Sequence, residues 1–408
     1  MQTRDNCVFV VVLSPLLTAN GPILHSSTMS SPGSTASLRS ANQQRVVDVL
    51  RAGGTVSQAD IARQTGLAPA TVSNIVRELA GAGLVATEPG SGRRGTTVAL
   101  ARTAGLVAGI DFGHSHVAVA LGDLTGQLLA EERRPIDFGH AYADGLAEAE
   151  SILDSLLAAE GLARDKVRTL GMGLPAPMTD GVVRTSAILP GWVGVNAQDA
   201  AREALGAVVH TENDANLGAL AEHRQGVARG HDTSVFVKVS SGVGAGIVLN
   251  DQLFHGAGGT AGEIGHLTLD ENGPVCRCGS RGCLEAYTST VALQAMMGLQ
   301  LPGATVDDIV GAARDGNVSA LRALEDAGLH LGWALASVVN LLNPALVVVG
   351  GDMARAGELL LESARIGLRR HALDAVASTP VVASELGERA SLVGAVLLAA
   401  ERTSLLTD

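Results

Sequence analysis

The stretch GIDFGHSHVAVALGDLTGQLLAE (residues 109–131) has the pattern of three short strands joined by two tight turns. A second stretch, VFVKVSSGVGAGIVLNDQLF (235–254), repeats this plan, and each copy leads into helical sequence. From about residue 105 onward strands and helices alternate, which is typical of an α/β fold. The repeat therefore predicts two similar lobes that face one another across a cleft, with a chance likeness between two strand meanders as the alternative.

The segment before the first copy has the pattern of a winged helix-turn-helix. A helix is expected over residues 41–51, and a second is expected from Ser57, which is placed to cap it. Gly66 suits the turn that follows, and Pro69 suits the first position of a third helix. The stretch GSGRRG (90–95) is then expected to form the tip of a hairpin.

The third helix is predicted to read DNA. Its apolar residues recur at helical spacing and should face the core: Val72, Ile75, Val76 and Leu79. The residues left facing outward are short and polar or basic, and can reach base edges and phosphates: Thr71, Ser73, Asn74 and Arg77. Arg93 and Arg94 at the hairpin tip suit a wing on the DNA backbone or minor groove. The alternative is an ordinary helical hairpin without a DNA role.

Charge is distributed unevenly along the 408 residues. The chain has a net charge of −12, which does not suggest a general nucleic-acid binder. Residues 39–100, however, carry seven arginines and four acidic residues, a local charge of +3. A DNA contact is therefore expected near the N-terminal end only.

Targeting signals are weak. No apolar run reaches the roughly 18–20 residues that a membrane span requires. The run CVFVVVLSPLL (7–17) is similar to a short signal-peptide core, but Asp5 precedes it and no clear cleavage site follows. We expect residues 1–38 to form a disordered tail, with Met29 as an alternative start, and the protein to be cytoplasmic with no membrane partner.

The most specific stretch is GHLTLDENGPVCRCGSRGCLE (265–285). Cys276, Cys278 and Cys283 have the spacing C-x-C-x4-C, and His266 lies ten residues upstream. Such a Cys3His set suits structural zinc, because four protein ligands leave no open position for catalysis. The alternative is a group of buried cysteines without a ligand. Crowded thiols of this kind indicate metal binding in a reducing compartment rather than a disulfide scaffold.

Polar residues suited to sugar binding surround this motif. They are Asn213, Asp214, Glu263, His266 and Glu285. Sugar hydroxyls both donate and accept hydrogen bonds, so these residue types are the expected partners. An aspartate that contacts a hydroxyl can also act as the base for phosphoryl transfer. Taken singly, each acid is more often a solvated surface charge or a helix cap.

The order of these motifs resembles the ROK family of repressors and sugar kinases over residues ~105–400. The resemblance is carried by ILPGW (188–192), ENDAN (212–216), SSGVGAG (240–246), the stretch from Gly256 to His266, CRCGSRGCLE (276–285) and NPALVVVGG (343–351). The winged helix-turn-helix upstream is similar to the repressor branch of the family. The resemblance implies a winged helix-turn-helix domain (39–102) followed by a two-lobed actin-like, ribonuclease-H-like α/β domain (105–408).

The resemblance also implies roles for single residues. Asn213 and Asp214 would hold sugar hydroxyls, with Asp214 the base in kinase members. Glu263, His266 and Glu285 would complete the sugar site, and Gly191 would approach the sugar by its backbone. His266, Cys276, Cys278 and Cys283 would bind zinc, and Gly350 and Gly351 lie where the family packs adenosine.

The first phosphate loop departs from the family pattern. Family kinases carry Asp-x-Gly-Gly-Thr, whereas this chain has Asp111, Phe112, Gly113, His114 and Ser115. The His114 imidazole stands where a glycine lets backbone approach phosphate, although a histidine can itself contact phosphate. The second loop is more nearly intact and contains Ser241, Gly242 and Gly244. Poor placement of phosphate would remove most of the catalysis, because phosphoryl transfer depends on positioning and charge stabilisation.

The leading hypothesis is a sugar-responsive transcriptional repressor of carbohydrate metabolism genes. Its partners would be operator DNA and a sugar or sugar-phosphate effector, and it would act as a homodimer or homotetramer. The rival hypothesis is an ATP-dependent kinase of a hexose or amino sugar, with ATP and Mg²⁺ as cofactors. A protein with both activities is the third possibility.

Overall fold

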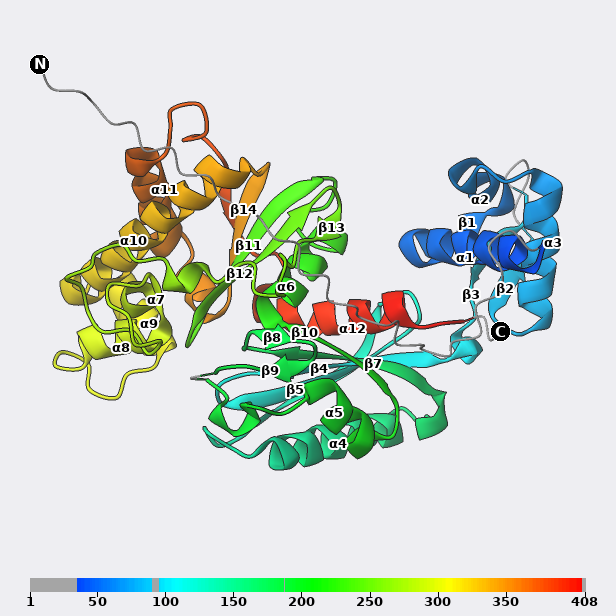
Figure 1. The fold of residues 1–408 in the computed structure, drawn as a ribbon, viewed down its shortest axis with the longest axis horizontal. Helices are drawn as coiled ribbons and strands as arrows, with labels where there is room; N and C mark the ends of the chain where they lie inside the picture. Colours follow the sequence, from blue (N-terminus) through cyan, green and yellow to red (C-terminus); the bar gives the residue numbers. More distant parts are fainter. Residues whose placement is uncertain (1–34, 90–94, 187, 406–408) are drawn as a thin grey trace, which may run out of the picture.

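The computed structural model describes residues 35–89, 95–186 and 188–405. Residues 35–89 and 95–104 form a small domain that contains three α-helices and a three-stranded sheet, which we call the head (Figure 1). Its helices are α1 (Thr35–Gly53), α2 (Gln58–Thr65) and α3 (Pro69–Gly81). Its strands, β1 (Val56–Ser57), β2 (Val85–Glu88) and β3 (Thr97–Leu100), pair in the order β1-β3-β2.

The local signals that predicted the head are confirmed. The Ser57 side chain accepts a hydrogen bond from the Asp60 N–H and caps α2. Gly66 ends this helix with φ of 70°, and Pro69 opens α3. The four apolar residues of α3 that were expected to face the core are all buried. The head therefore has the helix-turn-helix packing that its sequence pattern predicts.

The first helix starts earlier than expected, and the predicted wing residues lie outside the described part of the chain. We expected a tail over residues 1–38 and a helix over 41–51, but α1 already begins at Thr35. No glycine or proline interrupts the chain between Gly33 and Gly53, so the helix extends further toward the N-terminus than its apolar spacing indicated. Residues 1–34 of the expected tail, and Arg93 and Arg94 of the expected wing, lie outside the described residues.

The rest of the chain forms two sheets with the same strand order, as the internal repeat predicted. The first runs β10-β7-β4-β5-β6, and the second runs β13-β12-β11-β14-β15. In each sheet an antiparallel meander is extended by two parallel strands. The first sheet contains β4 (Leu106–Phe112), β5 (His116–Gly122), β6 (Leu128–Pro135), β7 (Val167–Leu174) and β10 (Val208–Asn213). The second contains β11 (Thr233–Val239), β12 (Val243–Leu249), β13 (Gln252–Leu253), β14 (Leu346–Gly350) and β15 (Val381–Ala383).

Helices cover the outer faces of both sheets and fill the space between them. The first sheet packs against α4 (Tyr142–Ala159) and α5 (Ala197–Leu205). The second packs against α8 (Thr290–Met297), α9 (Val306–Arg314), α10 (Val318–Leu342) and α11 (Glu358–His371). Between the sheets lie α6 (Asp214–Arg224) and α12 (Ala390–Arg402), and the C-terminal end of α12 points toward the head (Figure 1).

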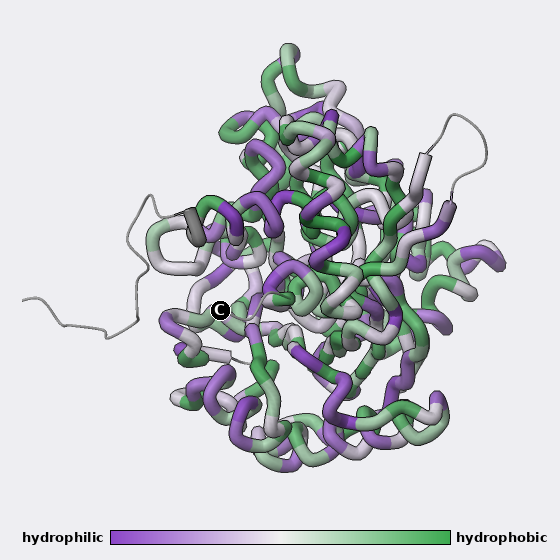
Figure 2. Tube along the Cα trace, turned by 90° about the vertical axis from the view of Figure 1, so that its right-hand side faces the viewer, coloured by the Kyte–Doolittle hydropathy of each residue, from purple (hydrophilic) through white to green (hydrophobic). Residues whose placement is uncertain are grey.

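One hydrophobic cluster joins the core of the head to the first lobe and α12. It contains Val46 and Val76 of the head, Val107 of β4 and Val396 of α12. Hydrophobic and hydrophilic residues both occur throughout the fold (Figure 2). None of the helices in the described part of the chain combines the length and apolar character needed to cross a membrane.

Candidate functional site

A cleft of about 660 Å³ lies between the two lobes. Its floor lies near the carboxyl ends of β4, β10 and β11, the edge of an α/β sheet where ligands generally bind. The structure brings most of the predicted sugar and phosphate residues to this cleft: Asp111, Gly113, Ser115, Asn213, Asp214, Ser241, Gly242, Gly244, Glu263, His266, Glu285 and Gly351. These residues, which are spread along the sequence from 111 to 351, therefore line one cleft.

Two predicted residues do not line the cleft. A Cβ on Gly191 would lie 2.2 Å from the carbonyl oxygen of His140, so this glycine packs against backbone. Gly350 is buried in β14, where a Cβ would lie 2.5 Å from the ring of Phe236. Close packing therefore explains why a glycine stands at each of these positions.

Asn213 and Asp214 form the start of α6 at the floor of the cleft. The Asn213 Oδ1 accepts hydrogen bonds from the N–H groups of Ala215 and Asn216. This cap uses the amide oxygen and leaves its NH₂ group for a ligand. Asp214 is only 7 % exposed, and its Oδ2 accepts a hydrogen bond of 2.8 Å from Lys238 Nζ. The candidate base is thus already paired with an ammonium group.

The first phosphate loop is filled by His116 rather than by His114 alone. A Cβ on Gly113 would lie 2.0 Å from the His116 ring, and the Gly113 N–H already donates to the His116 carbonyl. His116 Nε2 lies 3.5 Å from Asp111 Oδ2, and its Nδ1 lies 3.0 Å from an Arg133 nitrogen. The His114 ring, which we expected to block the loop, stacks on Phe138 with ring centroids 4.6 Å apart.

The second loop is also occupied by side chains of the protein. The Val243 N–H donates to Glu285 Oε2 at 3.1 Å, and Arg277 contacts both Glu285 and the Ser241 carbonyl. A carboxylate therefore already takes a backbone N–H that a phosphate oxygen would need. Glu285, predicted in the sugar site, lines the cleft and also connects the cysteine loop to the glycine loop.

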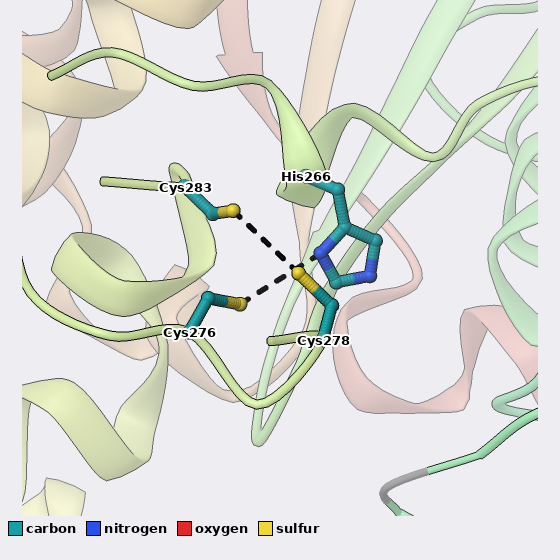
Figure 3. A group of neighbouring side chains, drawn as sticks. All are labelled: His266, Cys276, Cys278 and Cys283. Carbon is teal, nitrogen blue, oxygen red and sulfur yellow. Dashed lines mark hydrogen bonds between the residues drawn. The ribbon is translucent and has the colours of Figure 1, made fainter. Parts of the chain in front are cut away.

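The cysteine and histidine ligand atoms have the spacing of a metal site. Cys276 Sγ lies 3.8 Å from His266 Nδ1, and Cys278 Sγ lies 3.8 Å from Cys283 Sγ (Figure 3). All four ligand atoms lie within 4.8 Å of one another. Tetrahedral zinc with Zn–S bonds of about 2.3 Å requires thiolates about 3.8 Å apart, so the set fits. The Nδ1 of His266 faces the thiols, which leaves Nε2 for the cleft that His266 also lines.

Glu212 and His255 form an ion pair between the two lobes, at 2.7 Å, outside the predicted residue set. The Glu212 hydrogen bond raises the pKa of His255 above 6.5. Burial raises the pKa of Glu212, but the hydrogen bonds from His255, Asn216 and the Asn213 N–H, together with the charge of His255, outweigh it, so the net pKa falls below 4.5. Both side chains are therefore charged between pH 4.5 and pH 6.5.

His255→Gln is expected to lose more stability relative to the native protein near pH 5.5 than near pH 8. The raised pKa of His255 means that its contribution is full below 6.5 and is lost as pH rises through the folded value. Urea unfolding at the two pH values measures the difference. An equal stability difference at the two pH values would contradict the assignment of a charged Glu212–His255 pair.

In the head, the outward residues predicted on α3 are accessible. Asn74 and Arg77 are exposed, Thr71 and Ser73 are partly exposed, and Arg77 donates to Asn74 Oδ1 at 2.9 Å. Glu78, the next residue, is held by Arg39 and Gln43 of α1. The acidic side chain on this face is thereby paired within the head, and Arg77 remains available to a ligand.

Two family models match the chain. The model described as the ROK family matches residues 107–402, and the model described as the MarR family matches residues 40–95. The first match covers more than half of the chain. The chain belongs to the ROK family.

Regulators of the ROK family match both parts of the chain. The xylose repressor of Bacillus subtilis is 27 % identical over 366 residues, which cover 88 % of this chain and 94 % of that protein. A solved ROK family transcriptional regulator, described as a homologue of the E. coli MLC protein, has a TM-score of 0.74 at 27 % identity and covers 88 % of this chain and 96 % of its own. The glucokinase of Thermotoga maritima is 32 % identical, but covers 72 % of this chain and 97 % of itself.

Three polar residues of this ROK domain were missed from the sequence: Lys238, Arg277 and His116. A signal existed for Lys238, because it is the only charged residue in the apolar strand VFVKV and one of two lysines in the chain. Arg277 lies between Cys276 and Cys278, and the spacing motif assigned it no role of its own. His116 was noted in the turn, but nothing in the spacing showed that its ring would lie over Gly113.

Proposed function

We propose that this ROK protein is a sugar-responsive transcriptional repressor whose cleft binds a sugar without phosphorylating it. One observation carries the proposal: the chain joins a winged helix-turn-helix head to a sugar-type cleft whose two phosphate loops are filled by its own His116 and Glu285. Sugar-binding groups are retained in Asn213 and Glu263. Burial raises the pKa of Glu263 above its usual value.

The head would bind operator DNA as part of a dimer. In this arrangement α3 would enter the major groove, and Arg93 and Arg94, which lie outside the described residues, would contact the flanking backbone or minor groove. Two heads on a symmetric homodimer or homotetramer would read a near-palindromic site with fixed half-site spacing. Three free thiols at the metal cluster fit a protein that acts in the reducing cytoplasm.

Arg77→Ala is expected to weaken operator binding by about 1–3 kcal/mol, because it removes a contact to a base edge or phosphate. Sugar affinity should not change, since Arg77 lies on the head. The matched control is Arg322→Ala, which removes an exposed arginine from α10 of the second lobe. Fluorescence anisotropy with a labelled operator measures both variants. Native operator affinity in Arg77→Ala would refute the role of this residue.

Helix α12 gives the cleft a physical connection to the head. At its start, Ser391 Oγ donates to the Asp214 carbonyl at 2.9 Å. At its end, Arg51 of α1 donates to the carbonyl oxygens of Glu401 (3.4 Å) and Thr403 (2.5 Å). A sugar that draws the lobes together would shift this helix relative to the head. It can do so only by binding one lobe arrangement more tightly than the other.

The kinase hypothesis has two observations in its favour, Asp214 in the cleft and a second glycine loop. Against it stand the His116 ring over Gly113, the Glu285 carboxylate on the Val243 amide and the ammonium on Asp214. Phosphoryl transfer needs phosphates positioned by backbone donors and cations. We therefore favour the regulator, with zinc as a structural brace and without a role for ATP.

A further inference from the structure

Lys238 lies at the floor of the cleft and joins both lobes. It belongs to β11 of the second sheet, yet its Nζ donates to Asp214 Oδ2 at 2.8 Å and to Ser391 Oγ at 3.0 Å. The side chains of Lys238 and Asp214 are only 17 % and 10 % exposed. Burial lowers the pKa of Lys238, but attraction to Asp214 and Asp111 outweighs it, so the net pKa is raised. The ammonium is thus a fixed positive charge in the cleft.

Asp111 is the second carboxylate that acts on this ammonium. It is 3 % exposed, and its Oδ1 is buried without a hydrogen-bond partner within the described part of the chain. Burial raises the pKa of Asp111, but Lys238 and then His116 outweigh it, and the net pKa is lowered. Asp111 therefore stays ionised, with one oxygen unused and Lys238 as its main source of positive charge.

Two carboxylates beside a phosphate-binding loop commonly bind a divalent cation. Mg²⁺ takes oxygen ligands, commonly one or two carboxylates together with substrate phosphates. In this cleft Asp111 lies near the carboxyl end of β4, and Asp214 directly follows β10, a strand of the same sheet whose carboxyl end lies at the same edge. The positive charge beside both acids comes from the protein itself.

We propose that Lys238 takes the place of a divalent cation beside Asp111 and Asp214, so that the cleft binds its ligand without Mg²⁺. Its ammonium compensates the charge of both carboxylates. Its hydrogen bond also occupies Asp214 Oδ2, an oxygen that a general base would use to take a proton from a sugar hydroxyl. The proposal concerns the cleft alone and holds whether or not the head binds an operator.

The presence of only two lysines allows a direct test on the native, zinc-loaded protein. With ¹⁵N in the lysine side chains, the NMR signal of the Lys238 ammonium should be separate and slow to exchange, with exposed Lys166 as the internal reference. Mn²⁺ added in excess should leave the Lys238 signal as sharp as before. Saturable broadening of that signal, or exchange as fast as that of Lys166, would overturn the proposal.

Removing the ammonium should create a cation site. Lys238→Met is expected to gain one saturable Mn²⁺ site per chain, at least tenfold tighter than any in the native protein, and the further change Asp111→Asn should abolish it. Lys166→Met is the matched control and should bind Mn²⁺ as the native protein does. A folded Lys238→Met protein with unchanged Mn²⁺ affinity would refute the proposal. If this variant does not fold, the NMR experiment decides alone.

Discussion

Lys238→Met is expected to lower the free energy of unfolding by about 3–5 kcal/mol at pH 7, the usual cost of breaking a buried ion pair. Asp214 would remain nearly buried and ionised, and Asp111 would lose its main compensating charge. The raised pKa of Lys238 means that its contribution is full below 10.5 and is lost only as pH rises through its folded value. Neutral pH is therefore the right condition for urea unfolding.

The same experiment includes its own control. Adding Asp214→Asn to Lys238→Met removes the unpaired charge, so the double variant should recover a substantial part of the lost stability. Lys166→Met changes an exposed lysine and should unfold within about 0.5 kcal/mol of the native protein. A loss below about 1 kcal/mol in Lys238→Met would mean that water, rather than the ion pair, compensates Asp214.

Removal of the metal is expected to have the second large effect. Each chain should bind one zinc ion, and a strong chelator should destabilise the protein by about 4 kcal/mol relative to free zinc at a thousand times its Kd. Burial raises the pKa of the Cys276 thiol to about 12 in the metal-free chain, so binding must displace a proton and should weaken as pH falls. Sugar affinity should fall too, because the metal orients His266, which lines the cleft.

Cys283→Ala tests the same cluster by mutation. Cys283 is fully buried among the metal ligands, so its removal should abolish stoichiometric zinc and lower the melting temperature. Cys7→Ala is the matched control, since Cys7 is the one cysteine outside the C-x-C-x4-C motif. Metal analysis and thermal unfolding measure both. Native zinc content in Cys283→Ala would contradict the assignment of this cysteine as a ligand.

Local chemistry made the architecture predictable. The two strand meanders, the Ser57 cap, the Gly66 turn and Pro69 act over a few residues, and the structure has each of them where the sequence indicates it. The metal cluster was predictable for the same reason, because three of its ligands lie within eight residues. The start of α1 was wrong because helix extension beyond the apolar repeat leaves no periodic signal.

The interior of the cleft depends on contacts between distant segments. The family resemblance placed Asp111, Asp214 and Glu263 in one site. It gave no sign that Lys238 of the second sheet would bond to Asp214 at the end of the first sheet. Likewise nothing in the sequence indicated that Glu285 would accept a hydrogen bond from the Val243 N–H, 42 residues away. The expected obstruction at His114 belongs chiefly to His116, because ring direction is decided by packing rather than by order in the turn.

The most direct test is a titration of sugars against the zinc-loaded protein bound to DNA that it has selected from a random-sequence pool. Pentoses, hexoses, amino sugars and their phosphates are added with ATP and Mg²⁺ present, and DNA release and ADP are recorded together. We predict that one sugar class changes operator affinity by about 5–150-fold without ADP formation. Sugar-dependent ADP release that Asp214→Asn abolishes, with operator affinity unchanged, would contradict the account and make the protein a kinase.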